Sequence, residues 1–387
     1  NQQGKLQSTK DLSLKAQGID NQSGLIATQA KLDTQQQWLN NNKGQILSND
    51  ALTITGQRLS NQTGTIQTGA ALTLKLDGLL DNSQSGQILT AGDSQIQVGA
   101  LQNNAQGQIS VQGGLELTAQ QNIDNTAGVI AANKVVNIQT QDLYNSQGQI
   151  GSVTDQLNID TGSGALTNQS GVLQSTGDLT LKATGLNNNQ GQINSLGKAL
   201  INSQADLSND AGQIASHGQL EILSNNLSNK AGAIQTGDQA NLNLKITGAL
   251  NNQTGQIHSG ADQQITAQQI DNSAQGQITA QGDLNVQSQS DINNQTGQLI
   301  ANGAVDLKAQ SINNNQGQIG SLQDQLSIDA GQGTFTNQSG NVQAKKDISL
   351  TAKRVDNQQG QINSQSNIEL SSQQDINNLE GLIAADL

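Results

Sequence analysis

The stretch NNNQGQINS, from Asn187 to Ser195, decides the fold, because it returns almost unchanged as NNNQGQIGS from Asn313 to Ser321. Fainter copies occur along the whole chain of 387 residues. Internal similarity of this kind is the sequence signature of repeat architectures, in which each repeat packs on its neighbours. The content of one repeat therefore has to be defined before any single element is predicted.

Each copy of the repeat is marked by one glycine, which we call the motif glycine. The residue two positions after it is always aliphatic, and Asn stands three positions before it in seventeen of nineteen copies. In the other two copies, those of Gly86 and Gly276, the Asn stands one position further back, at Asn82 and Asn272. The nineteen motif glycines are Gly4, Gly24, Gly44, Gly64, Gly86, Gly107, Gly128, Gly148, Gly171, Gly191, Gly212, Gly232, Gly255, Gly276, Gly297, Gly317, Gly340, Gly360 and Gly381.

Three short apolar segments are found in each repeat of 20 to 23 residues. One follows the motif glycine, an alternating pair such as Leu179 and Leu181 comes eight to twelve positions after it, and a third aliphatic residue, such as Leu186, precedes the next motif glycine. Alternation with period two is typical of strands, because successive side chains point to opposite faces. Three short strands per repeat are therefore expected.

The repeat is too small to bury its own apolar face, so neighbouring repeats have to stack and share one core. With three aromatic residues and no Pro, Cys or Met, an ordinary globular core of large side chains is excluded. Connections between parallel strands are expected to be right-handed. We predict an all-β fold, a right-handed parallel β-helix (β-solenoid) of triangular section, with about 19 turns of 20–23 residues and three short strands per turn. Residues 1–387 are expected to be one continuous segment and an excerpt of a longer filament.

The Asn and the motif glycine predict a tight corner. At the first position of a type I turn, Asn can accept a hydrogen bond from the backbone N–H two residues on, and glycine at the fourth position often has a positive φ. Because the turns stack, each Asn is expected above the last, so that the side-chain amides form a ladder along the axis. The aliphatic residue after the glycine is expected to point inward.

The length of the turns also repeats, with a longer period than the motif itself. The turns that begin at Gly64, Gly148, Gly232 and Gly317 are enlarged, and these glycines are 84, 84 and 85 residues apart. Every fourth turn is therefore longer, which indicates growth by duplication of blocks.

The repeated pattern L-x-N-x-x-G-x-I-x-S/A/T is seen as INNNQGQIGS from Ile312 to Ser321 and, with one more residue, as LDNSQSGQI from Leu80 to Ile88. It resembles the filamentous haemagglutinin-type repeat region of large bacterial exoproteins exported by two-partner secretion, and the resemblance covers essentially the whole chain. It implies a structural shaft, secreted to the cell surface of a Gram-negative bacterium, with an outer-membrane two-partner secretion transporter as partner during export. Such repeats occur in filamentous adhesins and in contact-dependent growth inhibition effectors, so toxin and adhesin both stay open. A target-cell surface receptor would be bound through parts not in this chain.

Composition agrees with that interpretation. The absence of Cys means that no disulfide can lock the chain before it passes through an outer-membrane pore. No run of eighteen apolar residues occurs, so membrane insertion of this segment is not expected. The net charge of −13 opposes nucleic acid as a partner.

Asp155 and Asp160 are the first candidates for chemistry, and they recur as Asp324 and Asp329 on two enlarged turns. Some β-helices act on polysaccharides through clustered carboxylates, and calcium also binds carboxylates. Either role would need more converging oxygens than each pair supplies. We therefore expect four solvated corner residues.

The histidines and aromatic residues are also candidates. His217 and His258 follow their motif glycines at different distances, so they are expected at different points of the surface, without a metal site. Trp38 and Tyr144 each stand beside an inward aliphatic residue and should point outward, where they could stack on a sugar or be incidental. Phe335 takes the place of a core Leu.

These observations predict no catalytic, cofactor-binding or metal-binding residue, no cofactor and no enzyme activity. Three functions stay open. The first is a structural shaft that extends a distal receptor-binding or toxin module. In the second, the segment is itself an adhesin that binds a receptor or glycan through its enlarged turns or outward aromatic residues. The third is a β-helix enzyme that acts on polysaccharide and would contain a groove lined by carboxylates.

Overall fold

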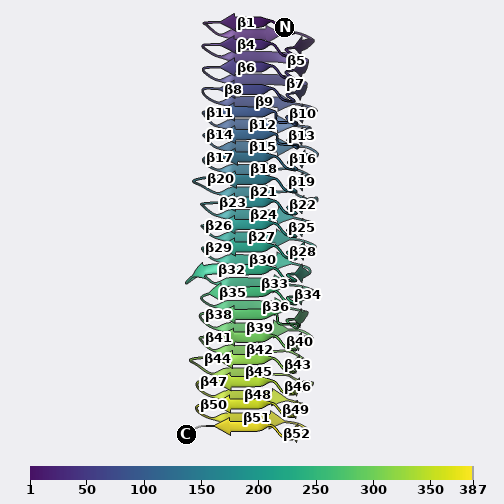
Figure 1. Cartoon of the computed structure of the whole chain (residues 1–387), viewed down its shortest axis with the longest axis vertical. Coiled ribbons are helices and arrows are strands. Elements are labelled where there is room, and N and C mark those ends of the chain that lie inside the picture. Colours follow the sequence, from purple (N-terminus) through teal and green to yellow (C-terminus); the bar gives the residue numbers. More distant parts are fainter. Residues whose placement is uncertain (386–387) are drawn as a thin grey trace. The chain divides into compact units, whose positions relative to one another are not determined.

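A computed structural model describes residues 1–385, and all regular elements among them are β-strands (Figure 1). The chain divides into two compact units, Asn1–Gly197 and Lys198–Leu387, which hold ten and nine motif glycines. Within each unit, strands pair in parallel with their equivalents one turn on, for example β17 (Val129–Ala132) with β20 (Gln149–Ser152). The predicted all-β solenoid with three strands per turn is confirmed. Among the described residues, no helix exists that could cross a membrane.

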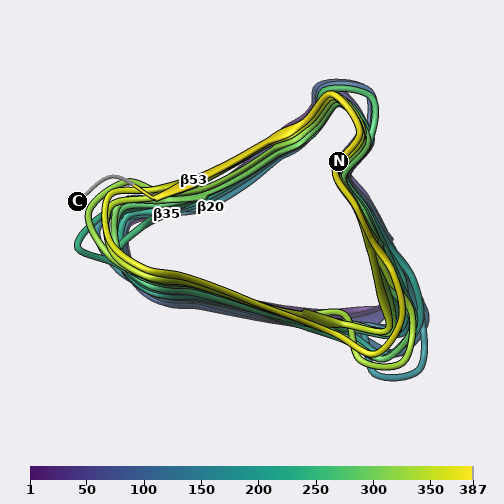
Figure 2. The ribbon, with the colours of Figure 1, turned by 90° about the horizontal axis from the view of Figure 1, so that it is seen from below.

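Seen along the stack, the turns of each unit trace three-sided loops (Figure 2). The first strand of a turn follows the motif glycine, and the second and third strands form the other two sides. In two turns of the first unit, the second and third strands merge into nine-residue strands, β5 (Leu32–Asn40) and β7 (Leu52–Ser60).

The first strands of unit Asn1–Gly197 are β1 (Lys5–Ser8), β4 (Leu25–Thr28), β6 (Gln45–Ser48), β8 (Thr65–Thr68), β11 (Gln87–Thr90), β14 (Gln108–Val111), β17, β20, β23 (Val172–Ser175) and β26 (Gln192–Ser195). Its separate second strands are β2 (Leu12–Lys15), β9 (Leu72–Leu76), β12 (Ser94–Val98), β15 (Leu115–Ala119), β18 (Val136–Gln139), β21 (Leu157–Asp160) and β24 (Leu179–Ala183). Its separate third strands are β3 (Gly18–Asp20), β10 (Leu79–Asp81), β13 (Ala100–Gln102), β16 (Asn122–Asp124), β19 (Asp142–Tyr144), β22 (Ala165–Thr167) and β25 (Gly185–Asn187).

The first strands of unit Lys198–Leu387 are β29 (Gln213–Ser216), β32 (Ala233–Asp238), β35 (Gln256–Gly260), β38 (Gln277–Ala280), β41 (Gln298–Ala301), β44 (Gln318–Ser321), β47 (Asn341–Ala344), β50 (Gln361–Ser364) and β53 (Leu382–Ala385). Its second strands are β27 (Ala199–Ser203), β30 (Leu220–Ser224), β33 (Leu242–Ile246), β36 (Gln263–Ala267), β39 (Leu284–Ser288), β42 (Val305–Lys308), β45 (Leu326–Asp329), β48 (Ile348–Ala352) and β51 (Ile368–Ser372). Its third strands are β28 (Leu207–Ser208), β31 (Leu227–Ser228), β34 (Ala249–Asn251), β37 (Gln269–Asp271), β40 (Asp291–Asn293), β43 (Ser311–Asn313), β46 (Thr334–Thr336), β49 (Arg354–Asp356) and β52 (Ile376–Asn377).

The core consists of stacks of inward aliphatic side chains. The residue two positions after the motif glycine is buried in most turns, and Ile130, Ile150 and Leu173 lie in register on three successive first strands. Burial of each such side chain is worth about 1.5–3 kcal/mol. Phe335 is also fully buried, between Ile312 and Val355, as predicted.

The Asn residues at the corner form the predicted ladder. Asn145 accepts a hydrogen bond from Asn125 Nδ2 on its Oδ1 atom and donates from its own Nδ2 to Asn168 Oδ1, both at 2.7 Å. The same Nδ2 also donates to the carbonyl oxygen of Gly148 at 3.2 Å. Each rung therefore joins two turns and closes its own corner. The ladder of the first unit contains Asn1, Asn21, Asn41, Asn61, Asn82, Asn103, Asn125, Asn145, Asn168 and Asn188. That of the second contains Asn209, Asn229, Asn252, Asn272, Asn294, Asn314, Asn337, Asn357 and Asn378.

The motif glycine is needed for a different reason from the one expected. The residue with positive φ is the one before it, such as Gln147 with φ 57°, and the motif glycines themselves do not have positive φ. A Cβ on Gly148 would lie 2.2 Å from the carbonyl oxygen of Asn125 in the preceding turn. The prediction of a positive φ at this glycine is wrong, because close approach of the neighbouring turn requires the glycine.

Two further details of the corner differ from expectation. The side chain that accepts a hydrogen bond from the backbone N–H two positions further along belongs to the residue before the ladder Asn, not to the Asn itself. In the turn of Asn125, for example, Asp124 Oδ1 accepts from the Thr126 N–H at 3.0 Å. In the turn of Gly107, the ladder Asn is Asn103, four positions before the glycine, whereas Asn104 donates to Asp124. The sequence has Asn at both positions, and the rule that the ladder Asn stands three positions before the motif glycine selects Asn104, which is wrong.

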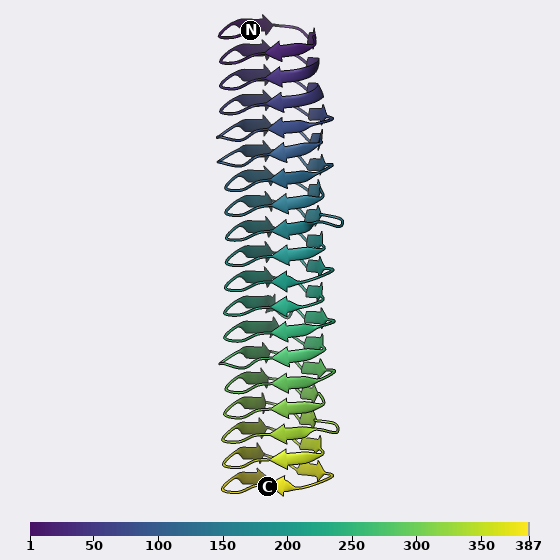
Figure 3. The same cartoon turned by 90° about the vertical axis from the view of Figure 1, so that its right-hand side faces the viewer.

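The enlarged turns place their additional residues at different corners. Residues 161–164 and 330–333 form loops between the second and third strands, and these loops project beyond their neighbours in Figure 3. In the turn of Gly232 the irregularity lies instead in β32, where the register with β35 shifts between Gln235 and Asp238. The enlarged turns therefore share a spacing along the chain and do not share one structure.

Removing one rung should loosen the turns on either side of it. Asn145→Ala removes the ladder acceptor of Asn125 Nδ2, which keeps the carbonyl oxygens of Gly128 and Gln149. It also leaves the buried Asn168 Oδ1 without its ladder donor, at a cost of about 1–3 kcal/mol. Ser146→Ala is the matched control, because the Ser146 side chain lies outside the ladder. Hydrogen exchange at the amides of Ile130, Ile150 and Leu173 should accelerate in the first variant only, and equal rates in both variants would contradict the role of the ladder.

The two residues of the corner should respond to substitution in opposite ways. Gly148→Ala introduces a Cβ that meets the Asn125 carbonyl oxygen and should destabilise the turn. Gln147→Gly relieves a left-handed backbone conformation, which costs an ordinary residue about 1–2 kcal/mol, and should be neutral or stabilising. Thermal unfolding of both variants tests the assignment. A melting temperature that fell more for Gln147→Gly would overturn it.

Candidate functional site

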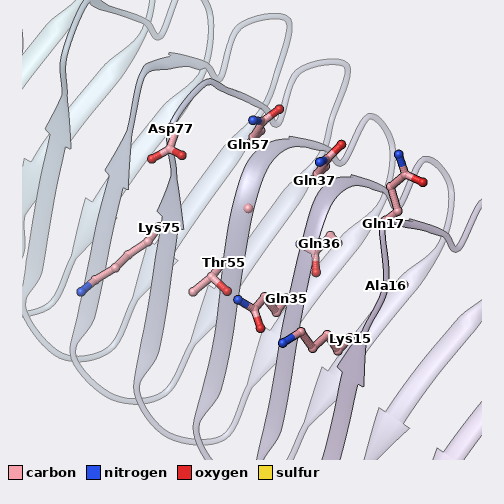
Figure 4. A pocket seen from close by; sticks show the side chains of 11 residues that line it. Lys15, Ala16, Gln17, Gln35, Gln36, Gln37, Thr55, Gln57, Lys75 and Asp77 are labelled. Atoms are coloured by element: carbon pink, nitrogen blue, oxygen red, sulfur yellow. The ribbon is translucent and has the colours of Figure 1, made fainter.

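A groove, which we call the corner groove, lies between the second and third strands in the first four turns of unit Asn1–Gly197 (Figure 4). Its volume is about 550 Å³. It lies where β5 and β7 run through the corner without a break. The residues that line it are Lys15, Ala16, Gln17, Gln35, Gln36, Gln37, Thr55, Gly56, Gln57, Lys75 and Asp77.

Two columns of polar side chains form the walls. One column runs along the second strands, since Lys15 pairs with Gln35, Gln35 with Thr55 and Thr55 with Lys75 in the parallel register. The other wall holds Gln17, Gln37, Gln57 and Asp77, which follow one another along the corner in Figure 4. The groove is therefore rich in carboxamides, with a lysine at each end of one wall.

Gln36 is the unusual residue beside the groove, because it alternates with the exposed Gln35 and Gln37 and therefore lies on the inward face of the strand. It pairs in register with Gly56, and Gly56 pairs with Leu76. The Gln36 side chain is 4% exposed, and neither its Oε1 nor its Nε2 atom has a hydrogen-bond partner. Burying an amide without partners costs about 1–3 kcal/mol for each unsatisfied group. The fold thus carries a destabilising group at this point.

The lysines of the corner groove are also without partners. Among the described residues, no carboxylate oxygen lies within 4.0 Å of the Nζ atoms of Lys15 or Lys75. Both charges therefore remain available in the groove.

Unit Lys198–Leu387 has a groove of about 420 Å³ at the same corner, which we call the second groove. Its wall repeats the first in kind, since Lys245, Thr266, Gln287 and Lys308 follow one another in register. Here, however, Lys245 pairs with Glu221 at 2.6 Å and Lys308 with Asp329 at 3.9 Å.

The floor of the second groove also differs. In place of a buried amide it has Ile246, Ala267 and Ser288, and the Ser288 hydroxyl donates to the carbonyl oxygen of Gln268 at 3.0 Å. The second groove has the same shape of wall with its charges and polar groups satisfied. It is a natural control for the first.

A third hollow, of about 470 Å³ in the first unit, is lined by the carboxylates of Asp93, Glu116 and Asp155. Each carboxylate already has a structural partner. Asp93 accepts from the Gly114 N–H at 2.9 Å, Asp155 from the Gln156 N–H at 2.8 Å, and Glu116 from the Asn137 amide. The carboxylates therefore brace successive corners and strands.

The paired aspartates of the sequence analysis lie at opposite ends of short strands. Asp155 precedes β21 and Asp160 ends it, and Asp324 and Asp329 have the same relation to β45. The backbone N–H of Gly162, followed by Lys182 at 3.2 Å, lowers the pKa of Asp160. Among the described residues, no group of three or more His, Cys, Asp and Glu side chains could hold a metal ion.

The histidines and aromatic residues are scattered. His217 is exposed and follows β29, whereas His258 lies on β35 and its Nδ1 atom is 2.9 Å from Thr279 Oγ1. Tyr144 points outward and is 41% exposed. Trp38 also faces outward but lies across Gly18 in the preceding turn, because a Cβ on Gly18 would be 2.0 Å from its Cε2 atom.

Sequence reasoning missed the corner groove. Lys15 and Lys75 are three turns apart in the chain, and Gln36 was not distinguished from the many surface glutamines. One feature of the sequence could have distinguished Gln36 from the surface glutamines. It follows Leu32 and Thr34 at alternate positions of one strand, and these positions face inward.

The fold and its polar corners define a β-solenoid repeat protein. The haemagglutinin repeat family matches the chain in eight overlapping segments, at residues 1–43, 32–84, 70–127, 89–169, 153–221, 209–294, 263–333 and 322–386. The chain therefore belongs to the haemagglutinin repeat family. No curated protein matches the chain, and no solved structure does. A haemagglutinin repeat solenoid fits the shaft of a filamentous adhesin or exoprotein, which is a secreted or cell-surface bacterial protein.

One surface ion pair allows a test of the electrostatics. Lys346 Nζ lies 2.9 Å from Asp324 Oδ1, and its hydrogen bond lowers the pKa of Asp324 below the ordinary value of 3.8. Because the folded-state pKa is lowered, the pair favours folding above pH 3.8, and this contribution is lost as pH falls through the lowered pKa.

Lys346→Gln should therefore raise the pKa of Asp324 towards 3.8, as measured by NMR of the carboxyl carbons. Asp347 is the control, since its pKa is lowered chiefly by the hydroxyl of Ser366 and should not move. An unchanged Asp324 titration would show that the ion pair does not form in solution.

Proposed function

We propose that residues 1–387 are one continuous shaft segment of a larger two-partner secreted exoprotein at the surface of a Gram-negative cell. The shaft holds a distal receptor-binding or toxin module away from that cell, in contact-dependent growth inhibition or in adhesion. The observation that carries this proposal is the corner, since the same Asn rung and close-packed glycine recur in turn after turn of both units. A structure built from one repeated contact suits a spacer, because turns can be added without a new design.

Export fits the same proposal. An outer-membrane two-partner secretion transporter is the partner during export, and the target-cell receptor is bound by parts outside this chain. The sequence has no Cys, so no disulfide has to be broken before threading. Nearest-neighbour stacking then lets the chain fold turn by turn as it emerges. We assign the segment no enzyme activity and no cofactor, since its function as a shaft needs neither.

A deletion in phase with the repeats tests the shaft. Removing Gly232 to Gln316 joins Ala231 to Gly317. Gly317 is a motif glycine, as Gly232 is, so Ala231 is still followed by a motif glycine and the corner is kept. The exoprotein should lose four turns, about 19 Å at the usual strand spacing, and keep its activity on target cells. Activity is measured as target-cell binding or growth inhibition at equal surface display.

The control deletion is out of phase. Removing Gly232 to Asp306 joins Ala231 to Leu307, which places a core strand residue where the motif glycine belongs. This variant should be displayed poorly or be sensitive to protease. If the in-phase variant were well displayed and inactive, the removed turns would carry the activity themselves, and the segment would be an adhesin in its own right.

A further inference from the structure

We propose that the outward face of the first strands of unit Asn1–Gly197 is a docking surface for a second copy of this chain. This goes beyond the shaft, which needs no partner along its length. The proposal depends on three features of that face: it carries no charge, its rows repeat at the strand spacing, and its area is large enough for a specific interface.

The face consists of the residues one and three positions after each motif glycine from Gly24 to Gly191, on the nine first strands from β4 to β26. We call it the uncharged face. These positions point outward, because the residue between them is buried, as Ile130 is between Val129 and Ala131. The first strands form one side of the three-sided turn, on which Figure 2 labels β20.

Charged residues are absent from the uncharged face and present on the other two sides of the same unit. Among the described residues of unit Asn1–Gly197, Lys5 on β1 is the only charged residue on a first strand. The charged residues on the second strands are Lys15, Asp33, Lys75, Glu116, Asp160 and Lys182. Those on the third strands are Asp20, Arg58, Asp81, Asp124 and Asp142.

Folding alone does not explain this distribution. The second strands alternate inward and outward in the same way, and their outward positions accept Lys and Asp. The first strands of unit Lys198–Leu387 also avoid charge, with Asp238 at the end of β32 as the charged residue among those described. The first strands of both units therefore follow a rule that the fold does not impose.

The sign of the charge indicates what the face can meet. The chain has a net charge of −13, so two copies repel one another. Like charges placed opposite one another in an interface cost several kcal/mol. The uncharged face is the side of this unit through which two copies can approach without opposing their charges.

The side chains of the uncharged face suit a protein partner. Gln occupies five of the nine positions directly after the motif glycine, and aliphatic residues such as Leu47 and Leu89 also point outward. At its rim, directly after β20 and β26, Val153 and Leu196 are 53% and 64% exposed. Amides and aliphatic side chains interdigitate between paired sheets. No aromatic residue lies on the face to stack on a sugar ring.

The spacing of the rows selects a second copy as the partner. Neighbouring strands lie about 4.7–4.9 Å apart, so the face presents rows of side chains at that repeat. A partner that matches nine rows needs the same repeat, and a second copy has it. Because the same face is used on both copies, the contact is isologous and closes as a dimer.

The area is sufficient for such a dimer. Nine strands at the usual spacing extend about 43 Å, and four residues of each strand extend about 13 Å. The face therefore covers about 560 Å² on each copy and about 1,100 Å² in the pair, above the limit of about 1,000 Å² for a specific interface.

The test is analytical ultracentrifugation of the whole chain from 1 to 100 µM. We expect a monomer–dimer equilibrium with a Kd in the micromolar range, which becomes tighter as salt screens the repulsion between copies. Gln108→Glu with Gln149→Glu places two charges in the middle of the uncharged face with little change of shape, and should weaken the dimer at least tenfold. Gln108→Lys with Gln149→Lys should weaken it likewise.

Mixing the Glu and Lys variants should restore association, because opposite charges then face one another. The matched control is Gln35→Glu with Gln97→Glu, which adds the same charge at exposed positions of the second strands and should leave the dimer unchanged. Equal melting temperatures of all these variants verify the fold.

A chain that remains monomeric at 100 µM, or equal weakening by the Glu variant and its control, would overturn the proposal. Association that persists in the Glu variant would also overturn it, since contact through the end strands β1 and β53 would be unaffected by these substitutions. None of these results bears on the shaft, because the in-phase deletion removes no first strand of unit Asn1–Gly197.

Discussion

The approach of one corner to the next is the constraint on which the rest of the structure depends. At each corner the backbone carbonyl of a ladder Asn lies where a Cβ on the next motif glycine would be, at 2.2 Å for Asn125 and Gly148. The side-chain amide of the same Asn spans to the next turn at 2.7 Å. Asn is suited to the rung because its short side chain has both a donor and an acceptor, whereas Asp lacks the donor. Strand spacing, core stacking and register follow from this contact.

Two residues of each corner, the ladder Asn and the residue before the motif glycine, have different structural roles. The ladder Asn makes the contacts along the axis, and the residue before the motif glycine adopts the left-handed conformation. Gln, Ser, Lys, Thr, Ala and Glu all occupy that second position. Its side chain has no partner to match in the ladder, so its identity varies while its conformation does not. The conformational cost of an ordinary residue there is offset by the rung beside it and by the aliphatic stack.

Sequence reasoning succeeded where a feature recurs in every turn. The ladder, the inward stack and the place of Phe335 all follow from the spacing around the motif glycine. It failed where the answer depends on the neighbouring turn. The choice between Asn103 and Asn104 is decided by the register with Asn82 and Asn125, and the need for glycine is decided by a carbonyl oxygen twenty residues away. Likewise, Gln36 can be distinguished only once Gly56 is known to lie opposite it.

An unpartnered buried amide does not by itself define a site, as Gln263 demonstrates. This residue is 2% exposed, its two polar atoms have no partner, and it lies between Leu242 and Leu284 on the inward face of the second strands. Leucines enclose it, so no ligand can reach it without opening the stack. Gln36 is also on the inward face of its strand, in line with Leu32 and Thr34, and its polar atoms are buried beneath the corner. A turn can therefore tolerate one unsatisfied buried amide, because the Asn rung and the remaining aliphatic stacks still hold that turn against its neighbours.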